Sequence, residues 1–189
     1  MIRAVALVCL CLVVGACSGE ESTESVNTPA QRIVTFAPHL AEIIYVVGAA
    51  DQLVGVSAWS DFPREVLDLP QVGDAFSVDQ EQLSLLQPDL VLVWESGMPR
   101  HAIDELRKLG YRVESVRTRS LDDVAAAIRR VGALTGHHSA AARAADGFAQ
   151  AFDALREESR DASPIDVFFQ VSARPRDTVD REVFISECI

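Results

Sequence analysis

The fold of this chain is decided by residues 87–97, whose sequence is QPDLVLVWESG. Five apolar residues in a row, from Leu90 to Trp94, stand between Pro88 and Gly97. A short apolar run between turn residues is typical of a strand that is buried on both faces, as in a parallel sheet. Ligands of open parallel sheets bind just beyond the carboxyl ends of the strands. Trp94, at that end, is therefore a candidate ligand-contacting residue.

Strands and helices alternate on both sides of this run. Further strands are predicted over residues 33–36, 53–57 and 111–116, and helices over 38–47, 77–86, 99–109, 120–135 and 139–160. Ser77 is expected to open its helix through a capping box with Gln80, and Ser120 is expected to cap another. This alternation predicts an α/β fold, a Rossmann-like parallel sheet with helices on both faces. After the long helix, residues 165–171 are predicted to start a second α/β lobe.

The bulk composition limits the size and the partners of the protein. A chain of 189 residues that is 49% hydrophobic can form one well-buried lobe but not two full-sized ones. The net charge of −11 argues against a nucleic-acid partner, because phosphate binding needs clustered Lys and Arg.

No catalytic motif stands out in the sequence. It contains no phosphate loop, no paired histidines at zinc-site spacing and no serine nucleophile in an elbow, so we expect neither an enzyme nor a metal site. His39 falls in the first turn after a strand, where ligands do bind, although a single imidazole there is usually structural. The His137-His138 pair is expected to be a polar connection between helices.

The amino terminus is typical of an export signal. Arg3 precedes an apolar core over residues 4–14, and Gly15-Ala16 provide a small-residue cleavage site. The next residue is Cys17, and residues 14–17 resemble the lipobox of bacterial lipoproteins. That resemblance implies a signal peptide over residues 1–16, a lipidated Cys17 that anchors the protein to a bilayer, and a tether over residues 17–30; the alternative is a plain secretory signal. Cys188 would then be alone, so we expect no disulfide.

Four aromatic side chains are candidates for a ligand site. Trp59 and Trp94 both follow neighbouring strands of the predicted sheet, at the same edge, and Phe62 and Phe76 lie on the loop between them. Such a wall suits an apolar, planar or bulky ligand better than a sugar or an ion. The alternative for each tryptophan is ordinary packing in the core.

Several segments carry a resemblance to a known family. They are RIVTFAP at residues 32–38, VGVS at 54–57, SDFP at 60–63, PDLV at 88–91 and Leu109-Gly110 before a strand. Their order and spacing resemble the amino-terminal lobe of cobalamin-binding substrate-binding proteins of ABC importers, a class in which one rigid helix joins two lobes. The similarity is less specific for corrinoids over haem or iron chelates.

The resemblance implies roles for individual residues. Trp59 and Trp94 match aromatic residues that contact the corrin ring. Glu81 matches a carboxylate that docks on arginines of the importer's membrane subunits, although by position alone it is a first-turn carboxylate favoured by the helix dipole. Where the family carries another aromatic residue, this chain has Ala75 in register and Phe76 next to it.

The resemblance also divides the chain. It implies a ligand-binding lobe over residues 31–136, an interlobe helix over 137–162 and the start of a second lobe over 163–189, most of which would lie beyond Ile189. A truncated gene product is therefore expected. The function implied is capture of cobalamin by a monomeric, lipid-anchored protein in the periplasm or at the cell surface, for delivery to an ABC importer, without a catalytic cofactor. The alternatives are a haem or ferric-siderophore binding protein of the same class, or an inactive truncated lipoprotein.

Overall fold

The computed structural model describes residues 28–163, 166, 168, 170–173 and 176–178. The signal peptide over residues 1–16, the lipidated Cys17 and nearly all of the tether that follows it are predictions that lie outside the described residues. The same holds for most of the segment from residue 164 onward, where the second lobe is expected to begin.

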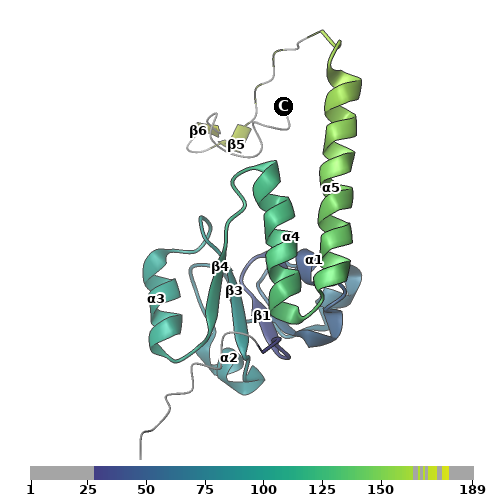
Figure 1. Ribbon diagram of the computed structural model, residues 1–189. Coiled ribbons are helices and arrows are strands. Elements are labelled where there is room, and N and C mark those ends of the chain that lie inside the picture. Colours follow the sequence, from purple (N-terminus) through teal and green to yellow (C-terminus); the bar gives the residue numbers. More distant parts are fainter. Residues whose placement is uncertain (1–27, 164–165, 167, 169, 174–175, 179–189) are drawn as a thin grey trace, which may run out of the picture.

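Four parallel strands form the sheet that organises the structure (Figure 1). They are β1 Ile33–Thr35, β2 Leu53–Val56, β3 Leu90–Trp94 and β4 Val113–Val116. Their order is β2-β1-β3-β4, so the chain runs outward from β1 to β2 and then crosses to the other side of β1. The prediction of a parallel α/β sheet is confirmed. The prediction that the strands before Trp59 and Trp94 are neighbours is wrong, because β1 lies between β2 and β3.

Helices follow the strands as the apolar spacing predicts. They are α1 Pro38–Val46, α2 Gln80–Leu86, α3 Arg100–Lys108, α4 Leu121–Thr135 and α5 His138–Ser159, with short 3₁₀ segments at Ala50–Gln52 and Arg64–Asp68. Ser120 caps α4 as expected, since its side chain accepts a hydrogen bond from the Asp123 N–H. The capping box at Ser77 is wrong: Asp79 caps α2 and accepts from the Gln82 N–H.

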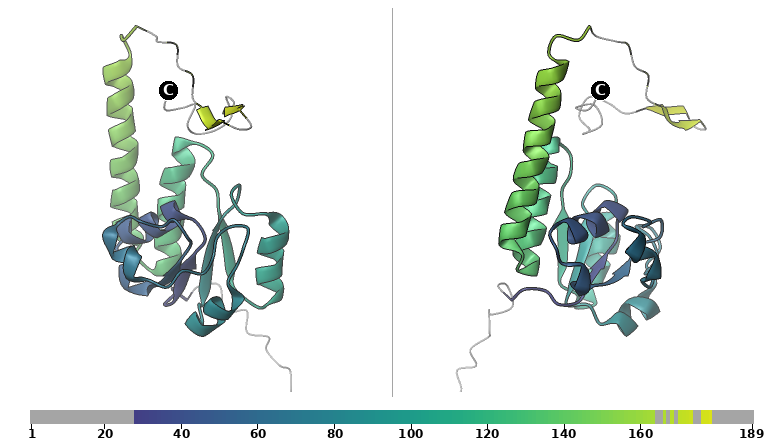
Figure 2. Two further views of the ribbon diagram at one scale, coloured as in Figure 1. Left: turned by 180° about the vertical axis from the view of Figure 1, so that it is seen from behind. Right: turned by 90° about the vertical axis from the view of Figure 1, so that its right-hand side faces the viewer.

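The strand β3 is the centre of two hydrophobic clusters, one on each face of the sheet. Leu90 and Leu92 pack with α1, α4 and α5, whereas Val91 and Val93 pack with α2 and α3. All four side chains are fully buried. Full burial of each contributes roughly 1.5–3 kcal/mol. Figure 1 shows the result, with α4 and α5 on one side of the sheet and α3 on the other, and the view from behind in Figure 2 agrees.

The long helix α5 lies alongside α4 and continues beyond it (Figure 2). Its contact with α4 is close because Gly132 faces Ala141, and a Cβ at position 132 would lie 2.1 Å from that of Ala141. After α5, β5 Gln170–Ala173 and β6 Arg176–Thr178 pair antiparallel in a separate small sheet. Of the strand predicted over residues 165–171, the last two residues belong to β5, and residues 165, 167 and 169 lie outside the described residues.

Candidate functional site

A hollow of about 270 Å³ lies where β1, β2 and β3 end. Its lining comes from the residues that follow these strands and from the loop before α2, namely Phe36, Ala37, Pro38, Ser57, Ala58, Trp59, Asp74, Ala75, Phe76, Trp94 and Gly97. We call it the aromatic hollow. Because the connections leave β1 and β3 in opposite directions along the sheet, the hollow lies at the topological switch point, where open α/β sheets bind ligands.

Hydrogen bonds hold the backbone around Trp59, and its side chain is exposed. The Ser60 N–H donates to the Ser57 carbonyl at 3.3 Å, the two serine hydroxyls lie 3.2 Å apart, and the Ala58 N–H donates to the Gly73 carbonyl at 2.7 Å. Trp59 itself has a φ of 67°, which is unusual for a residue with a side chain. Its side chain is 85% exposed, so a large aromatic surface is available to a ligand.

Phe76 is presented by a tight turn that Asp74 closes. The Asp74 carboxylate accepts hydrogen bonds from the backbone N–H groups of Phe76 and Ser77, each at 2.8 Å. Gly73 is required before this turn because its φ is 92° and a Cβ there would lie 2.0 Å from the Ser77 carbonyl oxygen. The Phe76 side chain is 83% exposed, and the neighbouring Ala75 also lines the hollow.

Trp94 is the half-buried member of the three aromatic residues. Its ring packs against the cluster that α1 and α4 cover, and it meets the ring of His39 edge to face, with the centroids 5.3 Å apart. Gly97 turns back over the indole so closely that a Cβ at position 97 would lie 2.0 Å from Trp94 Cε3. The ring therefore packs in the core and also lines the hollow, and its contact with a ligand stays a prediction.

The other predicted site residues lie outside the aromatic hollow. Phe62 is 65% exposed but is not among the residues that line it. Glu81 is exposed in the first turn of α2, and Leu85, one turn later, is 71% exposed. The structure therefore brings Trp59, Phe76 and Trp94 to one hollow and leaves Phe62 and Glu81 outside its lining, and the functional role of all five residues stays a prediction. The sequence interpretation missed Asp74 and Gly97, although Gly97 follows Trp94 within the stretch that decides the fold.

A second hollow, of about 300 Å³, lies between α3 and the ends of β3 and β4. Its lining carries both charges: Glu95, Arg100, Ile103, Asp104, Arg107 and Ser115. The Arg107 guanidinium already contacts Asp104 at 3.5 Å and the Ser115 hydroxyl at 3.4 Å. This lining is suited to water and internal ion pairs rather than to a planar apolar ligand.

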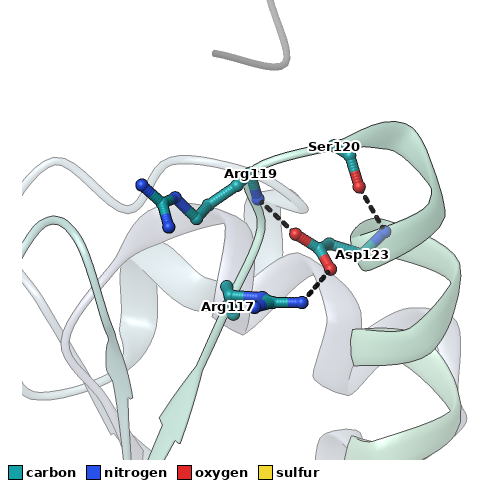
Figure 3. Close-up of polar contacts among 4 residues, drawn as sticks. All are labelled: Arg117, Arg119, Ser120 and Asp123. Carbon is teal, nitrogen blue, oxygen red and sulfur yellow. Dashed lines mark hydrogen bonds and ion pairs between the residues drawn. The ribbon is translucent and has the colours of Figure 1, made fainter. Parts of the chain in front are cut away.

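The loop from β4 to α4 borders the same end of the sheet and is fixed by Asp123 (Figure 3). The Asp123 carboxylate accepts from the Arg119 N–H at 3.0 Å and pairs with the Arg117 guanidinium at 3.1 Å. Burial alone would raise the pKa of Asp123, but these hydrogen bonds and the charge of Arg117 hold it below its ordinary value. The Arg119 side chain extends away from this contact in Figure 3.

Within the described ranges, His, Cys, Asp and Glu side chains do not form a group of three or more that could hold a metal ion. None of the helices in the same part of the chain combines the length and apolar character needed to cross a bilayer.

Comparison with known sequences identifies relatives. The family model described as "Periplasmic binding protein" matches residues 33–170. A vitamin B12-binding protein of Vibrio cholerae serotype O1 is 35% identical over 147 residues, which are 78% of this chain and 53% of the relative. Another, from Pectobacterium carotovorum subsp. carotovorum, is 33% identical over 161 residues, 84% of this chain and 58% of the relative. The chain thus spans little more than half the length of these relatives.

Solved structures give the same picture. The periplasmic vitamin B12 binding protein BtuF of Vibrio cholerae matches with a TM-score of 0.77 and 34% identity, over 84% of this chain and 62% of that one. The periplasmic haem binding protein HutB of Vibrio cholerae matches with a TM-score of 0.67 and 26% identity, over 77% of this chain and 56% of that one.

Proposed function

Because the chain belongs to the periplasmic binding protein family, we propose that it is an extracytoplasmic binding protein whose ligand is cobalamin or a related corrinoid. The relatives named vitamin B12-binding proteins support the ligand class, since they match most of this chain at 33–35% identity. The chain spans only part of their length, so the activity of the whole protein belongs to the proposal. Binding is the entire task, and no bond is made or broken.

The aromatic hollow is the observation that carries this proposal. Trp59 and Phe76 are 85% and 83% exposed, whereas large aromatic side chains usually bury most of their surface. Both lie with Trp94 at the switch point of the sheet, where they can contact one bulky ligand together. A corrin ring is broad, with largely apolar faces and polar but uncharged amide side chains around its edge, which suits this aromatic lining.

The donor set of the hollow favours a corrinoid over haem. Haem iron is normally held by His, Tyr, Cys or Met, and the described lining contains none of these residue types. His39 contacts Trp94, but it does not line the hollow and its Nε2 atom is buried. Cobalamin brings axial ligands of its own and needs no protein ligand on its metal. Asp74 is the one charged residue in the described lining, and its carboxylate would repel the two propionates of haem and the anionic groups of most ferric siderophores more than the single phosphodiester of cobalamin.

Delivery to an ABC importer is the second part of the proposal. Glu81 is exposed in the first turn of α2, where it can meet an arginine of a membrane subunit without rearrangement of the fold. A lipid on Cys17 would keep the monomeric protein at the membrane, in the periplasm or on the cell surface. We propose further that α5 is the interlobe helix and that residues 31–136 form the ligand-binding lobe.

The test compares three ligands under one set of conditions. The unchanged protein and its Trp59→Ala variant are each placed in equilibrium dialysis against cyanocobalamin, against haem and against a ferric siderophore. The proposal predicts binding of cobalamin that the change weakens and no comparable effect on the other two. Preferential, Trp59-dependent binding of haem would favour the haem-binding alternative. Failure of all three to bind would favour an inactive lipoprotein.

A further inference from the structure

Besides the core side chains, His39 and Gly97 contact the Trp94 ring. His39, the second residue of α1, meets the indole edge to face at an interplanar angle of 85°. The backbone of Gly97 also lies against the ring, closer than any side chain would allow. The pair of rings therefore joins the start of α1 to the end of β3.

Both rings carry a buried nitrogen for which the described protein offers no hydrogen-bond partner. These atoms are Nε2 of His39 and Nε1 of Trp94, and the hydroxyl of Thr35 in β1 is a third polar atom in the same condition. Buried polar side-chain atoms in folded proteins nearly always have a partner, either in the protein or in ordered water. A fourth such atom in the described residues, Oε1 of Gln52, precedes β2, whereas these three belong to α1 and to two of the strands on which it packs, so they call for a common explanation.

The pattern of the sheet puts the three side chains on one face. Leu90 and Leu92 of β3 point toward the cluster that α1 covers, and Trp94 continues this alternation. In β1, Ile33 belongs to the same cluster, so Thr35, two residues later, points the same way. Thr35 is level with Leu92 on the neighbouring strand, and α1 packs on both strands.

The chemistry of the three groups suits a single water molecule. Burial lowers the pKa of His39, so the imidazole is neutral and has one donor and one acceptor nitrogen. The indole N–H can only donate, and the threonine hydroxyl can do both. A water donates two hydrogen bonds and accepts two, and a buried water typically has two to four polar partners.

We propose that His39, Trp94 and Thr35 hold one buried water molecule that bridges the imidazole and the indole N–H. His39 is then a positioning residue, which sets the angle at which Trp94 faces the aromatic hollow. The bridge belongs to the protein without ligand, so its test is independent of the ligand that the hollow binds.

Nuclear magnetic resonance of the indole N–H tests this directly. The chain has two tryptophans, so the full chain with Trp59→Phe has a single indole N–H signal, that of Trp94. We expect a nuclear Overhauser cross-peak between this proton and a long-lived water, and slow exchange with solvent. His39→Phe keeps an aromatic ring but lacks the nitrogens. It should shift the indole signal, remove the water cross-peak and speed exchange by about tenfold, the effect of one ordinary hydrogen bond.

Two further variants separate positioning from general packing. His39→Gln places a polar group near the position of Nε2 and should restore part of the indole shift. His101→Phe is the matched control, because His101 is an exposed histidine on α3. The proposal is overturned if the Trp94 N–H shows no water cross-peak, or if His39→Phe moves its signal no more than His101→Phe does. Should His39→Phe fail to fold, Thr35→Val decides: loss of the cross-peak supports the bridge, and an unchanged spectrum contradicts it.

Discussion

Replacing Gly97 by alanine is expected to displace the indole of Trp94 and to weaken ligand binding at the aromatic hollow. The added Cβ would lie 2.0 Å from Cε3 of Trp94 and 2.7 Å from both Cδ2 and Cζ3. Carbon atoms in contact prefer separations of about 3.5–4.0 Å, so the ring must retreat by roughly 1.5 Å. The retreat is opposed by the core side chains and by His39, which pack against the same ring.

The expected magnitude follows from the cost of overpacking. Extra volume forced into a packed site typically costs about 1–3 kcal/mol. We expect the free energy of unfolding to fall by that amount. If the ring relieves the strain by tilting into the hollow, a ligand has to push it back. The binding free energy of the ligand then weakens by a similar amount, which raises its dissociation constant roughly 5–150-fold.

The assay uses the Trp59→Phe background, in which Trp94 is the only tryptophan. Its emission maximum and near-ultraviolet circular dichroism report the ring environment, and urea unfolding gives the stability. Gly147→Ala is the matched control, because nothing lies within 4 Å of a Cβ at that position in α5. The control should raise stability by about 0.5–1 kcal/mol and leave the Trp94 signals alone. If Gly97→Ala behaves like Gly147→Ala, the close approach of Gly97 to the indole is refuted.

Three other predictions concern separate parts of the structure. Trp59→Ala should leave the free energy of unfolding within about 0.5 kcal/mol, because the side chain is 85% exposed. It should nevertheless weaken cobalamin binding by roughly 2–3 kcal/mol, the value of covering about half of a tryptophan side chain. Calorimetry measures both the free energy of unfolding and the affinity for cobalamin. If the variant binds cobalamin as tightly as the unchanged protein, Trp59 does not contact the ligand. Asp123→Asn should destabilise the protein most above about pH 5. The lowered pKa of Asp123 means that its stabilising contribution is complete above the ordinary carboxyl pKa and is lost as the pH falls through the lower value of the folded state. Urea unfolding at several pH values should therefore show the two proteins converging in acid, and a constant difference would contradict this. Glu81→Gln should leave folding and ligand binding unchanged but reduce importer-dependent uptake into vesicles. Glu158→Gln, at an exposed site on α5, should leave this uptake unchanged. Equal uptake with the two variants would mean that Glu81 is only a first-turn carboxylate with no role in docking.

The fold could be predicted from the sequence because local signals and burial agree. The apolar run from Leu90 to Val93 fits only an element buried on both sides, and the structure buries all four side chains. Glycines at the ends of helices and Ser120 at the start of α4 likewise act through their neighbours in the chain. The start of α2 was misplaced because Ser77 and Asp79 are both good caps, and the turn closed by Asp74 uses the backbone N–H of Ser77.

The details of the site were less accessible because they depend on contacts between distant residues. The strand order, with β1 between β2 and β3, follows from crossover connections that no local pattern fixes. Contact of His39 with Trp94 joins the start of α1 to the end of β3. The backbone that carries Trp59 is joined to a distant residue by one hydrogen bond, from the Ala58 N–H to the Gly73 carbonyl. Aromatic residues near strand ends could be listed from the sequence, but only the packed structure separates Trp59, Phe76 and Trp94 from Phe62.

The central claim is that Trp59 and Trp94 contact one corrinoid in the aromatic hollow. The most direct measurement follows both indole N–H signals of the ¹⁵N-labelled chain while cyanocobalamin is added. Nuclear magnetic resonance detects weak binding as well as strong, so the length of the chain relative to its relatives does not prevent the test. Both signals are expected to move together, with one binding curve, and Trp59→Ala is expected to shift the curve of the remaining Trp94 signal to higher ligand concentration. Indole signals that stay in place while cobalamin binds elsewhere, or while haem alone moves them, would contradict it.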